Sequence, residues 1–170
     1  TIVVHYENGV LVRGVTRGNG IIGEDITANV RTVRSVPLKL RQSEIPYPER
    51  LVVRGEAFIT LDEFEKLNAR MAANDEKTYQ NPRNTAAGSL RQKDTALTAS
   101  RPLTWFCYSV IDHSGELPDT QWERLTLLRE WGFPVSDFST RAKDLDEVLA
   151  ICEDRIPRRD ELTFQADGIV

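Results

Sequence analysis

The dipeptide Asn8-Gly9 separates two runs that are rich in β-branched residues, at 2–7 and 10–15. Asn-Gly is the strongest short-range signal for a two-residue turn between antiparallel strands, because both residues tolerate positive φ angles. The chain is therefore predicted to open with a β-hairpin, and its fold has to contain an antiparallel sheet.

Apolar periodicity locates the remaining elements. Further strands are predicted at 51–59, 103–111 and 162–170, and a strand-like piece begins at 134–135. Helices are predicted at 26–33, 61–73, 84–92, 121–131 and 145–156. The run 103–111 is apolar at nearly every position, which is typical of a central strand. At 170 residues the chain is long enough for one hydrophobic core. The prediction is a single α+β domain over residues 1–170, with antiparallel sheets flanked by helices.

Composition argues against a strongly basic protein, a zinc site and a membrane span. Charged residues make up 28% of the chain and the net charge is -4, so any contact with nucleic acid has to come from local arginine clusters. Cys107 and Cys152 lie far apart in the sequence, and His5 and His113 are the only histidines of the chain, so a zinc site is not expected. The two cysteines are predicted to be buried, reduced thiols in a cytoplasmic protein. No apolar run reaches the length of a membrane span.

The stretch 81–92 combines small residues with two arginines. Its small residues at 86–89 predict a short, closely packed helix, and Pro82 biases the preceding residue away from the helical region. Arg83 and Arg91 flank these residues, and both guanidinium groups are predicted to reach a shared anionic group. The alternative is a surface helix with solvated arginines.

Glu56 is an acidic residue inside an otherwise apolar strand. Alternation places Arg54, Glu56 and Phe58 on one face of that strand. A carboxylate buried alone is costly, so Glu56 has to be paired, exposed or functional. It is predicted either to pair with Arg54 or to accept hydrogen bonds from the ribose hydroxyls of a nucleoside.

Two further features are consistent with a ligand site. The glycine-rich segment 16–20, followed by Gly23, forms either a long turn or a loop whose backbone approaches a ligand closely, and the adjacent Arg17 favours the loop. Tyr108 could stack on a base, or it could be a core tyrosine with a bonded hydroxyl.

Four separated pieces of the chain together resemble one enzyme family. They are Thr16-Arg17-Gly18-Asn19-Gly20 with Gly23-Glu24-Asp25, then Val53-Arg54-Gly55-Glu56, then the run 81–92, and finally Asp167-Gly168-Ile169-Val170. In this order they resemble the adenylation (nucleotidyltransferase) domain of the bacterial NAD-dependent DNA ligases. The resemblance covers essentially the whole chain.

The resemblance implies a role for seven residues. Arg17 would contact the phosphate and ribose region of NAD, Glu56 would hold the AMP ribose, Tyr108 would stack on adenine, Arg83 and Arg91 would bind phosphates of the leaving mononucleotide or of the DNA nick, Asp167 would sit near Mg²⁺, and Gly168 would allow close backbone approach. The chemistry implied is NAD-dependent sealing of nicks in duplex DNA during replication and the repair of DNA damage.

The family's nucleophile is the lysine of a Lys-x-Asp-Gly motif that precedes the residue matching Thr1. None of the five lysines of this chain is followed by Asp-Gly at that spacing, so no catalytic nucleophile is expected within it. The family's Asp-Gly-Val-Val-x-Lys motif is likewise interrupted after Val170. The chain is therefore expected to be part of a ligase, truncated at both ends and inactive in self-adenylation.

The resemblance also implies partners and surroundings. They are NAD, nicked duplex DNA and the other domains of the same ligase, in a monomer located in the bacterial cytoplasm and associated with the nucleoid. Two alternatives remain: a non-catalytic nucleic-acid-binding module with a ligase-like fold, and an adenylyltransferase that uses ATP. The first predicts DNA binding that does not depend on Glu56, and the second predicts that ATP replaces NAD.

Overall fold

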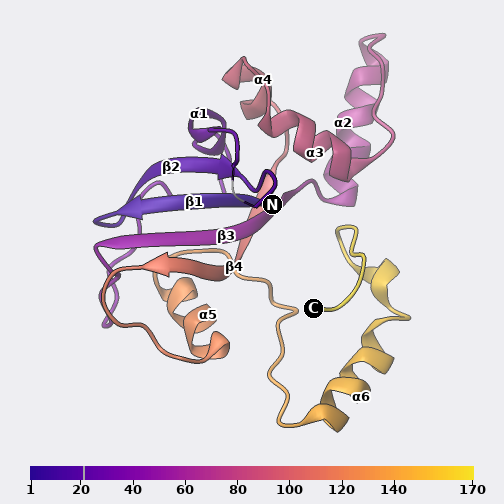
Figure 1. Cartoon of the computed structure of the whole chain (residues 1–170). Coiled ribbons are helices and arrows are strands. Elements are labelled where there is room, and N and C mark those ends of the chain that lie inside the picture. The colour runs from indigo at the N-terminus through magenta and orange to yellow at the C-terminus, as the bar shows by residue number, and fades with distance from the viewer. Residues whose placement is uncertain (21) are drawn as a thin grey trace.

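A four-stranded antiparallel sheet forms the centre of the computed structural model, which describes residues 1–20 and 22–170 (Figure 1). Its strands are β1 (Ile2–Glu7), β2 (Val10–Thr16), β3 (Arg50–Phe58) and β4 (Thr104–His113), in the spatial order β2-β1-β3-β4. The turn residues Asn8 and Gly9 have φ angles of 49° and 75°, so the predicted hairpin is confirmed.

The described helices are α1 (Thr27–Val30), α2 (Leu61–Ala73), α3 (Pro82–Leu90), α4 (Thr95–Ala99), α5 (Gln121–Glu130), α6 (Leu145–Arg155) and a 3-10 turn at Arg159–Glu161. The side chains of Thr60, Thr120 and Asp144 cap α2, α5 and α6 where the sequence predicted these helices to begin. Helix α3 begins two residues earlier than predicted, because proline at the first helical position needs no N–H partner. Among these helices, none is long and apolar enough to cross a membrane.

One face of the sheet is the hydrophobic core. Tyr6, Val53 and Trp105 are buried on this face, where the residues that follow α5 pack against them. The ring of Phe133 meets that of Tyr6 edge-on at 5.2 Å and lies 6.2 Å from Trp105. These large buried side chains fix the position of the central strands and therefore of the residues on their opposite face.

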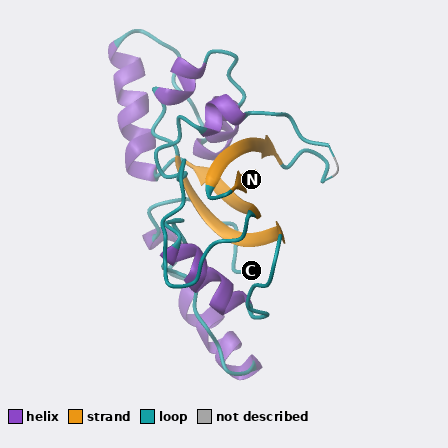
Figure 2. Ribbon diagram, turned by 90° about the vertical axis from the view of Figure 1, so that its left-hand side faces the viewer, coloured by secondary structure: helices purple, strands orange, loops and turns teal. Residues whose placement is uncertain are grey.

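The opposite face carries polar and aromatic side chains that are only partly covered. Arg54, Glu56 and Phe58 alternate with buried residues along β3, as the sequence predicted. Near one end of this face, Phe164 lies 5.1 Å from Phe58 and 6.2 Å from Phe106 between ring centroids. Figures 1 and 2 show both chain ends beside the same end of the sheet.

Strand β4 is an edge strand, so the prediction of a central position is wrong. Its apolar character on both faces has another cause. The core face of β4 is buried and its other face carries Phe106 and Tyr108, while its outer edge donates a hydrogen bond of 2.7 Å from Cys107 N to the Pro134 carbonyl. The segment at 134–135 thus covers the edge without forming a strand.

The segment 162–170 is irregular, and the strand predicted there is absent from the described residues. It is held instead by Phe164 on the sheet and by a hydrogen bond of 2.8 Å from Leu61 N to the Thr163 carbonyl. Helix α6, which precedes this segment, stands apart from the sheet in Figure 1 and has no buried residue. The segment therefore reaches the sheet through one aromatic side chain and not through a strand ladder.

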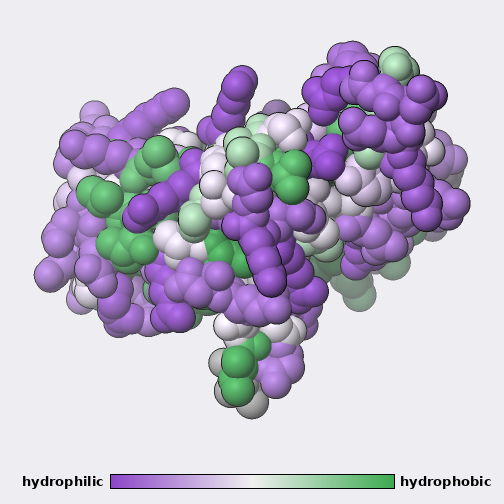
Figure 3. Space-filling view, turned by 90° about the horizontal axis from the view of Figure 1, so that it is seen from above, coloured by the Kyte–Doolittle hydropathy of each residue, from purple (hydrophilic) through white to green (hydrophobic). Residues whose placement is uncertain are grey.

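The two ends of the molecule have different surfaces. Seen from above in Figure 3, hydrophilic residues cover most of the lobe on the right, which carries α2 and α3, and apolar residues gather on the left. Val10, Val12 and Leu38, at the hairpin end, are among the exposed large apolar residues. Arg83 in α3 and Arg91 directly after it lie in the hydrophilic lobe.

The two cysteines differ in burial, which gives a testable difference in reactivity. Burial raises the pKa of the Cys107 thiol to about 12, whereas Cys152 in α6 is only half-buried, so the prediction of two buried thiols holds for Cys107 alone. The thiolate is the reactive form. Titration with a thiol reagent at pH 8 is expected to label one cysteine quickly and the second only after unfolding by denaturant. A Cys152→Ser variant should lose the fast phase; two equally fast equivalents would contradict this assignment.

Candidate functional site

Glu56 is bound by the first residue of the chain. The Thr1 hydroxyl donates a hydrogen bond of 2.7 Å to Glu56 Oε2, and the Thr1 amine lies 3.1 Å from Oε1. The Glu56 side chain is 39% exposed, and no bond joins it to Arg54 among the described residues. The predicted alternative of a Glu56–Arg54 pair is therefore wrong, and this carboxylate accepts a hydrogen bond from a hydroxyl at an accessible position.

An aromatic surface lies beside Glu56. Phe106 is its register partner on β4, and the ring of Tyr108 lies 6.4 Å from that of Phe106. Tyr108 is half-buried, and its hydroxyl makes no hydrogen bond within the described part of the chain. It is therefore not a core tyrosine with a bonded hydroxyl. A carboxylate next to partly exposed rings suits a ligand that has both hydroxyl groups and a flat aromatic part.

The loop after β2 leaves the sheet beside this carboxylate. Arg17 N donates a long hydrogen bond of 3.4 Å to the carbonyl of Thr1, the residue that binds Glu56. The Arg17 side chain is exposed. The structure thus brings the predicted residues Arg17 and Glu56 to the same end of the sheet.

Two glycines of this loop are required because the backbone of the loop leaves no room for a side chain. Gly18 has a φ of 54°, and a Cβ there would lie 1.7 Å from the Ile22 carbonyl oxygen. A Cβ at Gly23 would lie 2.1 Å from the carbonyl oxygen of Thr16. These glycines therefore allow the loop to close on its own backbone, which is a different reason from the ligand approach expected from the sequence.

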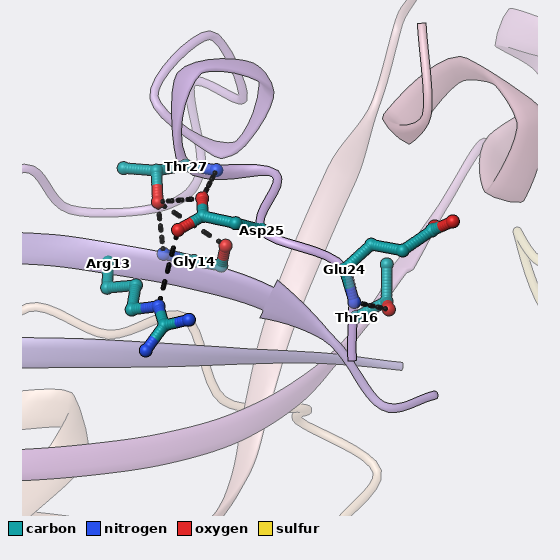
Figure 4. A network of polar contacts seen from close by, with 6 residues as sticks. All are labelled: Arg13, Gly14, Thr16, Glu24, Asp25 and Thr27. Carbon is teal, nitrogen blue, oxygen red and sulfur yellow. Dashed lines mark hydrogen bonds and ion pairs between the residues drawn. The ribbon is translucent and has the colours of Figure 1, made fainter. Parts of the chain in front are cut away.

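Asp25 anchors the loop to the sheet (Figure 4). It accepts hydrogen bonds from Thr27 N at 3.0 Å, from the Thr27 hydroxyl at 2.7 Å and from Arg13 Nε at 3.3 Å. The bonds from Thr27, and secondarily Arg13, hold the pKa of the Asp25 carboxyl below its usual value. Nearby, Glu24 N donates to the Thr16 hydroxyl at 2.9 Å, and in Figure 4 the Glu24 carboxylate points away from this network.

Helix α3 has small, exposed residues between two arginines. Thr85, Ala86, Ser89 and Leu90 are its buried residues beside Pro82. Ala87 and Gly88 are exposed, and a Cβ at Gly88 would have no neighbour within 4 Å, so only part of the predicted close packing through 86–89 occurs. Arg83 and Arg91 are eight residues apart, about 12 Å along a helix, with the small residues between them.

Each of these arginines pairs with a carboxylate from a distant segment. Arg83 Nη1 lies 2.6 Å from Asp167 Oδ2, and Arg91 Nε lies 2.9 Å from Glu24 Oε2. The two guanidinium groups therefore contact different carboxylates, and their reach to a shared anion stays a prediction. Both pairs are well exposed, and such pairs contribute little to stability. A ligand anion can thus replace either carboxylate at small cost.

A buried asparagine fixes the end of α3 from which Arg91 extends. Asn29 Nδ2 donates to the carbonyl oxygens of Leu90 at 2.9 Å and Gln92 at 2.8 Å. The Leu90 carbonyl ends the last turn of α3 and the Gln92 carbonyl follows it, and carbonyls at a helix end have no partner within the helix. No local sequence pattern predicts this contact, because Asn29 lies 61 residues before Leu90.

The resemblance predicts Asp167 near a metal ion and Gly168 at a point of close backbone approach. Both are exposed, and the Asp167 carboxylate is engaged by Arg83. The described residues contain no group of three or more His, Cys, Asp or Glu side chains able to hold a metal. Within the described part of the chain, Asp167 is therefore not part of a larger set of metal ligands. It offers one carboxylate, which fits the usual way in which Mg²⁺ is held by few carboxylates together with ligand phosphates.

Comparison with known proteins gives a consistent result. The sequence family described as the NAD-dependent DNA ligase adenylation domain matches residues 1–170. The DNA ligase of Chloroflexus aggregans is 49% identical over 177 aligned residues, covering 99% of this chain and 26% of that protein. The DNA ligases of Marinobacter nauticus and of Roseiflexus sp. strain RS-1 are 48% and 45% identical, each covering 99% of this chain and 25% of the relative.

The chain thus spans about a quarter of the length of these curated relatives. The match extends over both the strand that carries Glu56 and the helix that carries Arg83 and Arg91. The chain belongs to the family of NAD-dependent DNA ligase adenylation domains.

Proposed function

We propose that this chain supplies the nucleotide-binding part of an NAD-dependent DNA ligase that seals nicks in duplex DNA. The observation that carries the proposal is the accessible Glu56 carboxylate, which already binds a hydroxyl and lies beside an aromatic surface. In the proposed reaction a lysine nitrogen bonds to the α-phosphorus of NAD, and the bond from that phosphorus to the bridging oxygen breaks. Nicotinamide mononucleotide leaves with that oxygen.

The next two steps transfer and release AMP. The 5′-phosphate at the nick displaces the lysine from AMP, and the 3′-hydroxyl then bonds to the 5′-phosphorus and displaces AMP. Each step moves negative charge on phosphorus, so catalysis depends on positioning and on nearby cations. The exposed guanidinium groups of Arg17, Arg83 and Arg91 suit that task.

In this proposal Glu56 accepts hydrogen bonds from the ribose hydroxyls in place of the Thr1 hydroxyl, and Tyr108 stacks on adenine. Arg83 and Arg91 exchange their carboxylate partners for phosphates of the leaving mononucleotide or of the nick. Asp167 would sit near Mg²⁺, which supplies positive charge when bound, and Gly168 would allow close approach of the backbone to the ligand. Stacking and charge-assisted hydrogen bonds are each strong enough to orient a nucleotide.

The lysine nucleophile is proposed to precede Thr1, since no lysine of the chain has the required Asp-Gly neighbours. Residues joined to Thr1 would enter the site next to the ribose carboxylate, because Thr1 contacts Glu56. The parent ligase is proposed to act on nicked DNA as a monomer, together with its other domains.

Intact-protein mass after incubation with NAD and magnesium tests the function. This chain is compared with a version extended upstream through the Lys-x-Asp-Gly motif and with the extended version carrying alanine in place of that lysine. A gain of one AMP only in the extended, unsubstituted protein is expected, and ATP should not replace NAD. No gain in any version would contradict the proposal and favour a nucleic-acid-binding module, whose salt-dependent DNA binding would not depend on Glu56.

A further inference from the structure

Arg54 occupies an unusual position on the open face of the sheet. Its guanidinium carbon lies over the Tyr108 ring, 5.6 Å from the ring centroid. Its Nε is buried and has no hydrogen-bond partner, and no ion pair of the described residues includes its side chain. A buried guanidinium nitrogen without a partner is uncommon, because arginine normally uses its donors on carboxylates or carbonyls.

The nearest carboxylate along the strand does not explain this placement. Glu56 lies two residues further on the same face of β3, its Oε2 accepts a hydrogen bond from the Thr1 hydroxyl, and no ion pair of the described residues joins it to Arg54. What remains for Arg54 is the aromatic ring, over which a flat guanidinium group can stack with a favourable cation–π interaction. The ring therefore determines where Arg54 lies, and Arg54 in turn restrains the ring.

The restraint matters because nothing else described holds the Tyr108 ring by a polar contact. Its hydroxyl is unbonded within the described residues, and the neighbouring ring of Phe106 is 6.4 Å away between centroids. A tyrosine ring has two faces, and Arg54 lies over one of them. A base that stacks on this ring would therefore have to use the other face.

We propose that Arg54 is a positioning residue that acts through Tyr108: it holds the ring in the orientation that accepts the adenine of a bound nucleotide. This inference rests on the proposed function, because it assumes that an adenine nucleotide binds beside Glu56. It assigns Arg54 to recognition of the base and not to the phosphates or the ribose.

Base dependence distinguishes this role from phosphate binding. Affinities of the chain for AMP and for ribose 5-phosphate, which has no base, are measured by titration calorimetry. Arg54→Met keeps much of the side-chain volume and removes the charge and the planar group; it is expected to weaken AMP binding about 3-fold to 30-fold and leave ribose 5-phosphate binding unchanged. Arg54→Lys keeps the charge without the flat group, and its AMP affinity should lie between those of the unsubstituted chain and Arg54→Met. It serves as a second variant if Arg54→Met folds poorly.

A matched control and a double mutant complete the test. Arg50→Met removes an arginine from the same face of the same strand, but Arg50 pairs with Asp112 and not with a ring, so it should not change the AMP affinity relative to ribose 5-phosphate. In a Tyr108→Ala background, Arg54→Met should have no further effect on AMP binding.

The other possible results contradict either the role of Arg54 alone or the proposed function as well. Equal loss of AMP and ribose 5-phosphate binding in Arg54→Met would mean that Arg54 acts on the phosphate or on folding, and unchanged AMP binding would mean that it has no role. Either would refute this inference and leave the proposed function standing. Failure of the unsubstituted chain to bind AMP would refute both.

Discussion

Substitution of Glu56 by glutamine is expected to lower the affinity of the chain for AMP by about 10-fold to 100-fold, since a hydrogen bond to a charged group contributes about 1.5 to 3 kcal/mol. Glutamine keeps the shape of the side chain but loses the charge that two ribose hydroxyls would share. The measurement is titration calorimetry of AMP with both proteins. In the extended protein, AMP transfer from NAD should fall in parallel.

A modified ligand shows whether the ribose is the group that Glu56 recognises. AMP that lacks both the 2′- and the 3′-hydroxyl should bind weakly to the unsubstituted chain and equally weakly to Glu56→Gln. Glu7→Gln, at the far end of the same sheet face, is the control and should not change AMP binding. If Glu56→Gln bound AMP as well as the unsubstituted chain does, the assignment of Glu56 to the ribose would be wrong.

Features set by neighbouring residues could be predicted from the sequence. The hairpin follows from Asn8-Gly9, and the start of α2 follows from Thr60, whose hydroxyl accepts a hydrogen bond from Glu63 N. Glu56 was found because an acid between apolar neighbours has few explanations. In each case the decisive interaction is contained within a few residues of the signal.

Features that depend on contacts between distant residues could not be predicted from the sequence. Strand β4 has the apolar pattern of a central strand, but the 134–135 segment, almost thirty residues away from Cys107, covers its edge. The contact between Arg54 and Tyr108 could not be predicted from the sequence, for a geometric reason. The register of β3 and β4 shifts between Val52 and Val53 and again between Arg54 and Gly55, so alternation alone does not identify the neighbour of Arg54.

The small residues on α3 predict close packing at all four positions 86–89, and the structure separates two roles. Ala86 and Ser89 face the interior, whereas Ala87 and Gly88 lie on the exposed face with Arg83 and Arg91. Helical periodicity distinguishes these faces only if one residue is known to be buried. The partners of both arginines are also distant: Asp167 is 84 residues from Arg83 in the sequence.

Replacing Gly55 with alanine is expected to reduce the free energy of unfolding by about 3 kcal/mol or more. A Cβ at this position would lie 2.2 Å from the Phe106 carbonyl oxygen and 2.4 Å from Cε2 of Trp105. The carbonyl belongs to the backbone of the adjacent strand, and Trp105 is completely buried, so neither can move without disturbing the core. Urea denaturation of both proteins measures the difference.

Gly88→Ala is the matched control, because a Cβ there has no neighbour within 4 Å. Alanine should raise the free energy of unfolding by about 0.5 to 1 kcal/mol, since it favours the helix and restricts the unfolded chain. That same entropic benefit applies to Gly55→Ala and is outweighed only if the overlap with Trp105 is real. A stable Gly55→Ala protein would therefore show that β3 and β4 are further apart than described, and the position of Glu56 beside Phe106 would have to be revised with them.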